Sequence, residues 1–261
     1  MTSQRLDFSK TLFAIVTGTG RGIGRFITQY LAKNAAPGSK IVGISNLPDK
    51  VNQVRELCEG ASKDVNIELQ ISDLSKVDIG EFNSLIDNVL TNPNITTRPY
   101  DCSLIVHNAG TVGEVEPSKN LEDLSIWHKY YDLNLFSPIL LNTSFLKHCK
   151  PYVPHLFIVN ISSIFTVSGL PNLSMYCSAK AARNAYFTVL AKEEPDITVL
   201  NYSPGAVAKT FFWDELSKKA PKLKLETVTV DKTVTTLFEH LTKGDYNSGG
   251  TLDVHGRSLF K

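Results

Sequence analysis

The sequence shows no excess of charge of either sign. Its 27 basic and 26 acidic side chains leave a formal charge of +1 over 261 residues. A protein that binds nucleic acid normally carries a basic excess or a clustered basic stripe, and neither is present. We therefore expect no nucleic-acid partner.

Cysteine is scarce. The four cysteines are scattered along the chain, and no two of them form a Cys-x-x-Cys pair. A disulfide framework and a zinc site are therefore not expected, and neither is any other metal. This pattern favours a reducing compartment and predicts a cytoplasmic protein.

The chain also lacks a segment suited to membrane insertion. Its first residues, Met1–Asp7, contain no long apolar run, so we expect no secretory signal. Residues 151–179 contain no aspartate, glutamate, lysine or arginine, but prolines, asparagines and serines interrupt them. The polar groups of these residues would be unsatisfied in lipid, so a buried strand followed by a loop is expected. No membrane partner is predicted.

What the sequence does contain is a regular alternation of short β-branched runs and longer segments with helical spacing. Strands are predicted at Leu12–Thr17, Lys40–Ser45, Asn66–Ile71, Cys102–His107, His155–Ile161 and Ile197–Tyr202. Helices are predicted near residues 22–34, 49–59, 76–91, 121–148 and 174–193. Such alternation is typical of parallel βαβ units with helices on both faces of the sheet. The predicted fold is a single α/β domain over residues 1–261, a doubly wound Rossmann fold that binds ligands at the carboxyl ends of its strands.

A glycine-rich turn follows the first predicted strand and opens directly into a helix. Its spacing, Gly18, Gly22 and Gly24, differs from the common Gly-x-Gly-x-x-Gly dinucleotide pattern. Glycines let backbone amides approach a pyrophosphate, and the helix N-terminus behind them carries partial positive charge. The predicted cofactor-binding residues of this turn are Gly18, Thr19, Gly20, Arg21, Gly22, Ile23 and Gly24.

The end of the second predicted strand bears on the choice of cofactor. Sites for NAD usually place an acidic residue there to accept a hydrogen bond from the ribose 2′-hydroxyl. This strand ends in Ser45 and Asn46, without an acid. Arg21 can pair with a 2′-phosphate through its planar guanidinium, so we predict NADP(H) as the cofactor. The alternative for Arg21 is a solvated turn residue.

Tyr176 and Lys180 form a pair whose setting is more informative than its spacing. Both lie in an alanine-rich segment with good helix propensity, and residues four apart share one face of a helix. Ser163 follows the strongly apolar fifth strand. A lysine cation about 4 Å from a tyrosine would lower the tyrosine pKa by about three units, less the opposing effect of burial. The three residues predict reduction of a carbonyl group, with Tyr176 donating the proton and Ser163 orienting the substrate oxygen.

Together these features resemble the short-chain dehydrogenase/reductase family. The matching positions are the Thr17–Gly24 turn, Asp73, Asn108-Ala109-Gly110, Asn134, Ser163, Tyr176, Lys180 and Pro204-Gly205. The resemblance implies that Asn134 supports a proton relay and that Lys180 binds the nicotinamide ribose. It further implies cofactor contacts from Ser45, Asn46, Asp73, Leu74, Asn108, Ala109, Gly110, Tyr176, Pro204, Gly205 and Val207. It also implies a homodimer through the helices near 121–148 and 174–193.

Within this family the sequence resembles the sepiapterin reductases, through Val159–Ser163, Tyr176–Arg183, Val189–Pro195 and Val199–Gly205. The implied activity is NADPH-dependent reduction of the side-chain ketone of a pterin. The implied substrate-binding residues are Ser163, Tyr176, Gly205 and Asp253. The carboxylate of Asp253 would accept paired N–H bonds from the aminopyrimidine edge of the pterin. Two departures are Ser45, where the group has an arginine, and the segment 206–210, which lacks the usual Asp-Thr arrangement.

Other functions remain open at this point. A reductase of α-dicarbonyls or aromatic diketones would use the same chemistry, because the pyruvoyl side chain of a pterin is itself a vicinal dicarbonyl. A sensor that binds NADP without catalysis would use the same glycine turn, with less need of Ser163, Tyr176 and Lys180. The alternative for Asp253 is a residue that caps the last strand or lies solvated at the surface.

Overall fold

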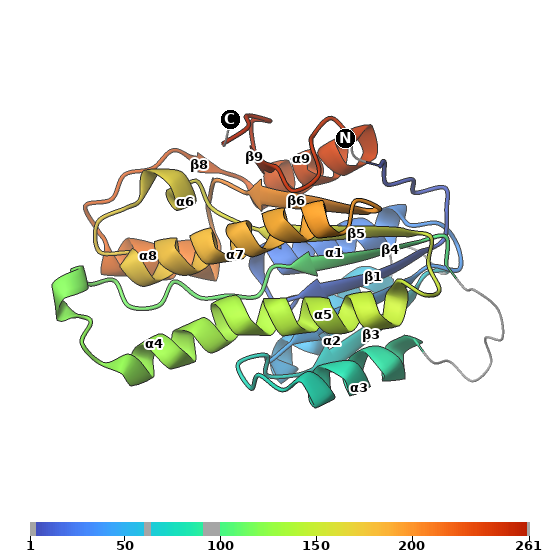
Figure 1. Cartoon of the computed structure of the whole chain (residues 1–261), viewed down its shortest axis with the longest axis horizontal. Coiled ribbons are helices and arrows are strands. Elements are labelled where there is room, and N and C mark those ends of the chain that lie inside the picture. The colour runs from blue at the N-terminus through green and yellow to red at the C-terminus, as the bar shows by residue number, and fades with distance from the viewer. Residues whose placement is uncertain (1–3, 60–63, 91–99, 260–261) are drawn as a thin grey trace.

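The computed structural model describes residues 4–59, 64–90 and 100–259 (Figure 1). Seven strands form one sheet in the order β3-β2-β1-β4-β5-β6-β9, and all neighbours pair in parallel. The strands are β1 (Leu12–Thr17), β2 (Lys40–Ser45), β3 (Asn66–Ile71), β4 (Cys102–His107), β5 (His155–Ile161), β6 (Ile197–Ser203) and β9 (Thr251–Asp253). The six predicted strands are confirmed, and β6 continues one residue further. A second, two-stranded sheet pairs β7 (Ala206–Val207) with β8 (Thr227–Val228).

Helices connect the strands of the large sheet. They are α1 (Gly22–Asn34), α2 (Pro48–Glu59), α3 (Ile79–Leu90), α4 (Leu124–Tyr131), α5 (Ser137–Cys149), α6 (Phe165–Ser168), α7 (Ser174–Glu193), α8 (Phe211–Lys219) and α9 (Val230–Lys243), with a 3₁₀ turn η1 (Ser118–Asn120). The helix predicted at 76–91 begins later, and residue 91 lies outside the described residues. Among the residues that the structure describes, no helix is long and apolar enough to cross a membrane.

The helix predicted over 121–148 is interrupted by a π-helical segment, η2 (Asp132–Phe136), between α4 and α5. Pro138 stands in the first turn of α5 and has no backbone N–H to donate to the carbonyl of Asn134, four residues earlier. The chain widens instead, and the N–H of Ser137 donates to the carbonyl of Asp132, five residues earlier. Such π-helical turns are often found at functional sites.

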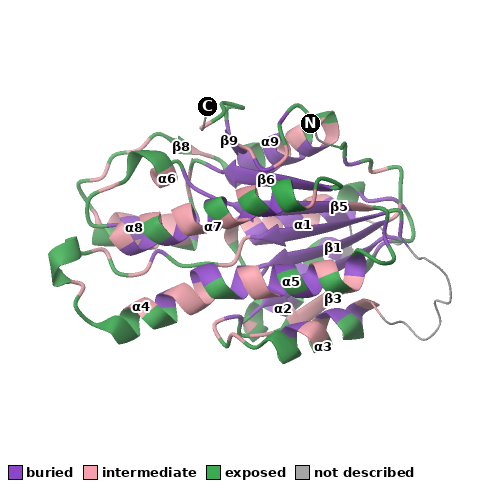
Figure 2. Cartoon of the chain, in the orientation of Figure 1, coloured by how far each residue is buried: buried purple, intermediate pink, exposed green. Residues whose placement is uncertain are grey.

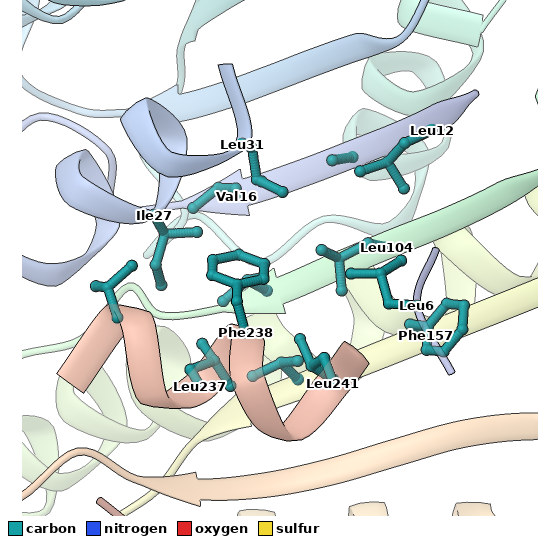
Figure 3. Close-up of a cluster of buried hydrophobic side chains, with 14 of the residues drawn as sticks. Leu6, Leu12, Val16, Ile27, Leu31, Leu104, Phe157, Leu237, Phe238 and Leu241 are labelled. Carbon is teal, nitrogen blue, oxygen red and sulfur yellow. The ribbon is translucent and has the colours of Figure 1, made fainter. Parts of the chain in front are cut away.

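Two hydrophobic cores lie on opposite faces of the sheet, because successive side chains of a strand point to opposite sides. On one face Val16 of β1 packs with Ile27 of α1 and Phe238 of α9 (Figure 3). On the other, Ile15 packs with Phe145 of α5 in a core that α3 and α7 also cover. Figure 2 shows the inner strands of the large sheet buried, the edge strand β3 only partly buried, and the outer sides of the helices exposed. Each fully buried side chain of this size contributes roughly 1.5–3 kcal/mol, so both helical layers are firmly held.

The carboxyl ends of the strands share one edge of the sheet. Helices α4, α6 and α8 extend beyond that edge, together with the small sheet of β7 and β8 (Figure 1). Helices α6, α8 and α9 were not predicted from the sequence. For α9 the signals are present: Thr229 caps the helix by accepting from the N–H of Lys232, and Gly244 ends it with a φ of 66°.

Candidate active site

A cavity of about 530 Å³ opens at the carboxyl edge of the sheet. Most of the predicted site residues line it: Gly18, Gly20, Arg21, Gly22, Ile23, Ser45, Asn46, Asp73, Leu74, Asn108, Ala109, Gly110, Ser163, Tyr176, Lys180, Pro204, Gly205, Val207 and Asp253. Three do not line it and are buried in the protein: Thr19, Gly24 and Asn134. Residues from the first strand to the last therefore meet at one site, as expected for a doubly wound sheet.

The glycine turn is packed too closely for side chains. A Cβ atom at Gly24 would lie 2.3 Å from the carbonyl oxygen of Gly18, and one at Gly20 would lie 2.6 Å from Oγ of Ser45. Gly18 itself has a φ of 73°, which favours glycine. Asn108 holds the turn against β4, because its Nδ2 donates to the carbonyl oxygen of Thr17 at 2.8 Å. The conformation of the turn is therefore fixed, and at its glycines only backbone atoms face their neighbours.

The N-terminus of α1, which this turn leads into, is left without a cap from the chain. Arg21 at the N-cap position makes no capping hydrogen bond, and the first turn contains no acidic residue. The first backbone N–H groups of a helix need a partner, and an anion satisfies them well. The open cavity, the bare turn and the uncapped helix therefore fit the pyrophosphate of a dinucleotide.

Arg21 lines the cavity together with Ser45 and Asn46 at the end of β2. Its Cζ is 3.5 Å from the ring centroid of Phe211 at the start of α8. Burial lowers the pKa of Arg21 and Glu215 opposes this effect, but a guanidinium stays charged at neutral pH. An exposed cation–π contact is worth about 0.5–1 kcal/mol, whereas a hydrogen bond to a charged group is worth about 1.5–3 kcal/mol. A 2′-phosphate would therefore draw Arg21 away from Phe211.

Asp73 and Leu74 follow β3 at the far side of the same cavity. Oδ1 of Asp73 accepts from the backbone N–H of Ser75 at 3.1 Å and from its hydroxyl at 2.8 Å. These bonds lower the pKa of Asp73 and keep the carboxylate charged. Leu74 is buried in the core beneath it. Asp73 therefore provides a polar side chain and Leu74 an apolar one, and this combination suits an adenine ring.

Ser163, Tyr176 and Lys180 come together in the lining of the cavity. The ring centroid of Tyr176 lies 5.9 Å from Nζ of Lys180, and Nζ donates to the backbone carbonyl of Ile161 at 2.6 Å. Tyr176 and Lys180 are only 7% and 6% exposed, so the pair is shielded from bulk water. The helical spacing of the pair on α7 is confirmed.

The expected fall in the pKa of Tyr176 is wrong for this structure. Burial raises the pKa of Tyr176 to about 12, and the hydrogen bond with Ser163 opposes that rise only in part. Burial also lowers the pKa of Lys180 well below its usual value, and the charge of Arg183 adds to this effect. Both groups line the cavity but are almost fully buried, so desolvation outweighs the attraction between them. Tyr176 is therefore a protonated phenol at neutral pH.

Asn134 lies in the π-helical segment, beneath the loop that follows β4. Its Oδ1 accepts from the backbone N–H of Thr111 at 3.0 Å, and its Nδ2 donates to the carbonyl of Tyr130 at 2.9 Å. A Cβ atom at Gly110 would lie 2.7 Å from Oδ1 of Asn134. The side chain of Asn134 therefore braces the Asn108–Gly110 loop from behind.

Asp253 at the end of β9 lines the cavity, but the chain itself uses its carboxylate. Oδ1 accepts from the backbone N–H groups of His255 and Arg257, both at 2.9 Å. Oδ2 accepts from Nε of Arg257 at 2.7 Å and from its terminal nitrogen at 2.7 Å. Burial raises the pKa of Asp253, but these hydrogen bonds outweigh burial and leave it lowered. The geometry favours the turn-capping alternative over a free anchor for a pterin.

An apolar wall that the sequence did not predict faces Tyr176. Phe165 of α6 and Phe212, Trp213 and Leu216 of α8 line the cavity, and the rings of Tyr176 and Phe212 lie 5.4 Å apart. The only signal in the sequence is the cluster of three aromatic residues at 211–213. This wall would place an apolar or aromatic group of a bound molecule beside Tyr176.

Comparisons of the sequence and the fold with known proteins identify a family for this chain. A family model described as short chain dehydrogenase matches residues 12–221. Over 256 residues the chain is 30% identical to the sepiapterin reductase of Mus musculus, covering 92% of this chain and 95% of that protein. It is 24% identical over 200 residues to a benzil reductase ((S)-benzoin forming) of Bacillus cereus, covering 75% of each chain. The structure of 7α-hydroxysteroid dehydrogenase complexed with NADH and 7-oxo glycochenodeoxycholic acid matches with a TM-score of 0.76 at 21% identity, over 97% of this chain and 96% of that one.

Proposed function

The chain belongs to the short-chain dehydrogenase/reductase family and is an NAD(P)-dependent oxidoreductase acting on CH–OH or C=O groups; within that family we propose that it is an NADPH-dependent carbonyl reductase, with the side-chain ketone of a pterin as its first candidate substrate. The observation that carries the proposal is the convergence of Ser163, Tyr176 and Lys180 in the lining of the cavity that the glycine turn also lines. A sensor without catalysis would not need these three side chains at one place.

The proposed mechanism assigns one task to each group. The bare turn and the N-terminus of α1 hold the cofactor phosphates, and Lys180 binds the nicotinamide ribose. When bound, the cofactor supplies the hydride. Ser163 donates a hydrogen bond that orients the substrate oxygen, and Tyr176 gives its phenolic proton to that oxygen as the alcohol forms. A tyrosine with a pKa of about 12 is fully protonated at neutral pH, which is the form that reduction needs.

The preference for NADPH is tested by Arg21→Ala. Losing one charged hydrogen bond to the 2′-phosphate costs about 1.5–3 kcal/mol, so the Kd for NADPH should rise about 10- to 150-fold. The Kd for NADH should change little, because NADH has no 2′-phosphate. Fluorescence titration with each cofactor measures both values. Lys33→Ala removes an exposed cation from the other end of α1 and serves as the matched control. Tighter binding of NADH than NADPH by the parent protein would contradict the assignment.

Two substrate classes are supported by different observations. The pterin is supported by the 30% identity to a sepiapterin reductase over most of the chain. A vicinal diketone with apolar or aromatic groups is the second candidate. It is supported by the aromatic wall beside Tyr176 and by the engagement of Asp253 with Arg257. A pterin can use the carboxylate of Asp253 only by displacing the guanidinium of Arg257.

Asp253→Asn separates the two substrate classes. If Asp253 anchors a pterin, kcat/KM with sepiapterin should fall about 10- to 150-fold, the equivalent of one charged hydrogen bond. Reduction of a small vicinal diketone should barely change, because it has no aminopyrimidine edge. In the same assay Arg257→Met frees Oδ2 of Asp253 and should raise kcat/KM with sepiapterin alone. Equal losses on both substrates in Asp253→Asn would show a structural role, and no turnover of sepiapterin by the parent would favour the diketone.

We also propose a homodimer and a cytoplasmic location. Leu124, Ile126 and Phe136 on the α4–η2–α5 segment and Val189 on α7 are exposed apolar side chains, which supports pairing through these helices. Phe187 and Leu190 of α7 are buried in the core and so are not available for pairing. All four cysteines are free thiols, which supports a reducing compartment.

A further inference from the structure

Arg183 is a charged side chain with no exposure to solvent. It lies on α7, where Lys180 and Arg183 follow Tyr176 by four and seven residues. Residues at these spacings share one face of a helix, so Arg183 continues the stripe that begins with the proton donor. The mechanism proposed above assigns no role to Arg183.

The contacts of Arg183 are with backbone carbonyls. One terminal nitrogen donates to the carbonyl of His107 at the end of β4 at 2.8 Å, and the other donates to the carbonyl of Asn134 at 3.3 Å. Nε is buried without a hydrogen-bond partner. Among residues 4–59, 64–90 and 100–259, no carboxylate forms an ion pair with the guanidinium. Burying an unpaired cation costs several kcal/mol, so the charge is present at the expense of stability.

The carbonyl of Asn134 is available because of the local sequence. Pro138 cannot donate to it, so the α-helical hydrogen bond at this place is missing and the segment is π-helical. Arg183 supplies a donor in place of the missing N–H. The side chain of Asn134 also accepts a hydrogen bond from the backbone N–H of Thr111, in the loop after β4. The guanidinium of Arg183 therefore links two elements next to the site, the π-helical segment and the end of β4.

The charge of Arg183 is not cancelled by its neighbours. Burial lowers the pKa of Arg183 to about 10, so it remains protonated at neutral pH. Burial and Arg183 together lower the pKa of His107 to about 3, so this histidine is neutral. The other titratable groups near Tyr176 are Cys177 and Lys180 on α7 and Tyr130 on α4, with Glu215 of α8 on the opposite wall of the cavity.

We infer that Arg183 is a positioning residue for the reaction: it holds the π-helical carbonyl of Asn134 against the end of β4 and places a fixed positive charge on the face of α7 that carries Tyr176 and Lys180. The inference rests on the proposed reductase function, because it assigns Arg183 a part in preparing the proton donor. The charge stabilises the phenolate that Tyr176 becomes after it has given its proton. It also disfavours a second charge on Lys180.

The test compares Arg183→Gln, which is neutral and keeps an N–H donor, with Arg183→Lys, which keeps the charge. In each background Tyr176 is replaced by a fluorinated tyrosine, whose lower intrinsic pKa brings its titration into the pH range of the folded protein. Absorbance of the phenolate then reports the midpoint without any substrate. We expect Arg183→Gln to raise the midpoint by about one pH unit and Arg183→Lys to leave it near that of the parent. Lys192→Gln, which removes an exposed cation from the same helix, should have no effect.

An unchanged midpoint in Arg183→Gln, or equal shifts in the glutamine and lysine variants, would overturn the inference. If Arg183→Gln does not fold, Arg183→Met is the second neutral variant, because an apolar side chain of similar length needs no desolvation of a charge. The kinetic companion is kcat for carbonyl reduction, which should fall about tenfold in the neutral variant with the Kd for NADPH unchanged. A shifted titration in a protein that reduces no carbonyl would refute the reductase function and leave the electrostatic role of Arg183 standing.

Discussion

Replacing Tyr176 by phenylalanine should lower turnover by about 10²- to 10⁴-fold, the usual contribution of a general acid. The change removes the phenolic proton and keeps the ring, which packs against Phe212 and in the cluster with Leu173 and Leu216. Cofactor affinity should therefore stay close to that of the parent. The assay is consumption of NADPH with a vicinal diketone, together with a fluorescence titration of NADPH binding.

Tyr186→Phe is the matched control for this substitution. Tyr186 lies on the same helix and packs against Phe187, away from the cavity. Its loss of a hydroxyl should leave turnover unchanged. A Tyr176→Phe protein that keeps most of its activity would mean that another group donates the proton, and the proposed mechanism would then be wrong.

Lys180→Ala should damage both turnover and cofactor binding. The lysine lines the cavity, donates to the carbonyl of Ile161 and lies beside Tyr176, so its loss should remove the proposed ribose contact and disturb the proposed proton donor together. We expect turnover to fall about 10²- to 10⁴-fold and the Kd for NADPH to rise about tenfold, as for the loss of one hydrogen bond. The same two assays measure these effects, with exposed Lys192→Ala as control. An unchanged Kd for NADPH would show that Lys180 does not contact the ribose.

Most of the strands could be predicted from the sequence because they are short apolar runs that are buried on both faces of a parallel sheet. The helix near 121–148 was less predictable. Its apolar pattern continues through the π-helical turn, and the break depends on a single proline, Pro138, inside a periodic segment. Helix α8 is rich in lysine near its end, and its role as a wall of the cavity comes from the fold alone.

The convergence of Ser163, Tyr176 and Lys180 on one cavity could be predicted because the carboxyl ends of parallel strands meet at one edge. Ser163 after β5 therefore lies close to Tyr176 and Lys180 on α7, although it is not adjacent to them in the sequence. The environment of Asp253 could not be predicted, since its partner, Arg257, lies four residues later on a turn with no periodic pattern. The stacking of Arg21 on Phe211 joins residues far apart in the chain, and no local signal indicates it.

The effect of desolvation on the pKa values of the site residues was the property least predictable from the sequence. A lysine beside a tyrosine suggests a lowered tyrosine pKa, but the sign changes when both groups are buried, as Tyr176 and Lys180 are. The burial of Arg183 could not be predicted from the sequence either. In the sequence it reads as an ordinary arginine of a surface helix, and only the packing of α7 against the π-helical segment shows that its charge is buried.

The most direct test of the central claim is the consumption of reduced cofactor by the purified protein with a panel of carbonyl compounds that includes sepiapterin and small vicinal diketones. We expect NADPH to be consumed in equal amount to the alcohol formed, faster than NADH, and at a rate that collapses in Tyr176→Phe. A protein that binds NADPH tightly yet reduces no member of the panel faster than its Tyr176→Phe variant would contradict the assignment as a carbonyl reductase.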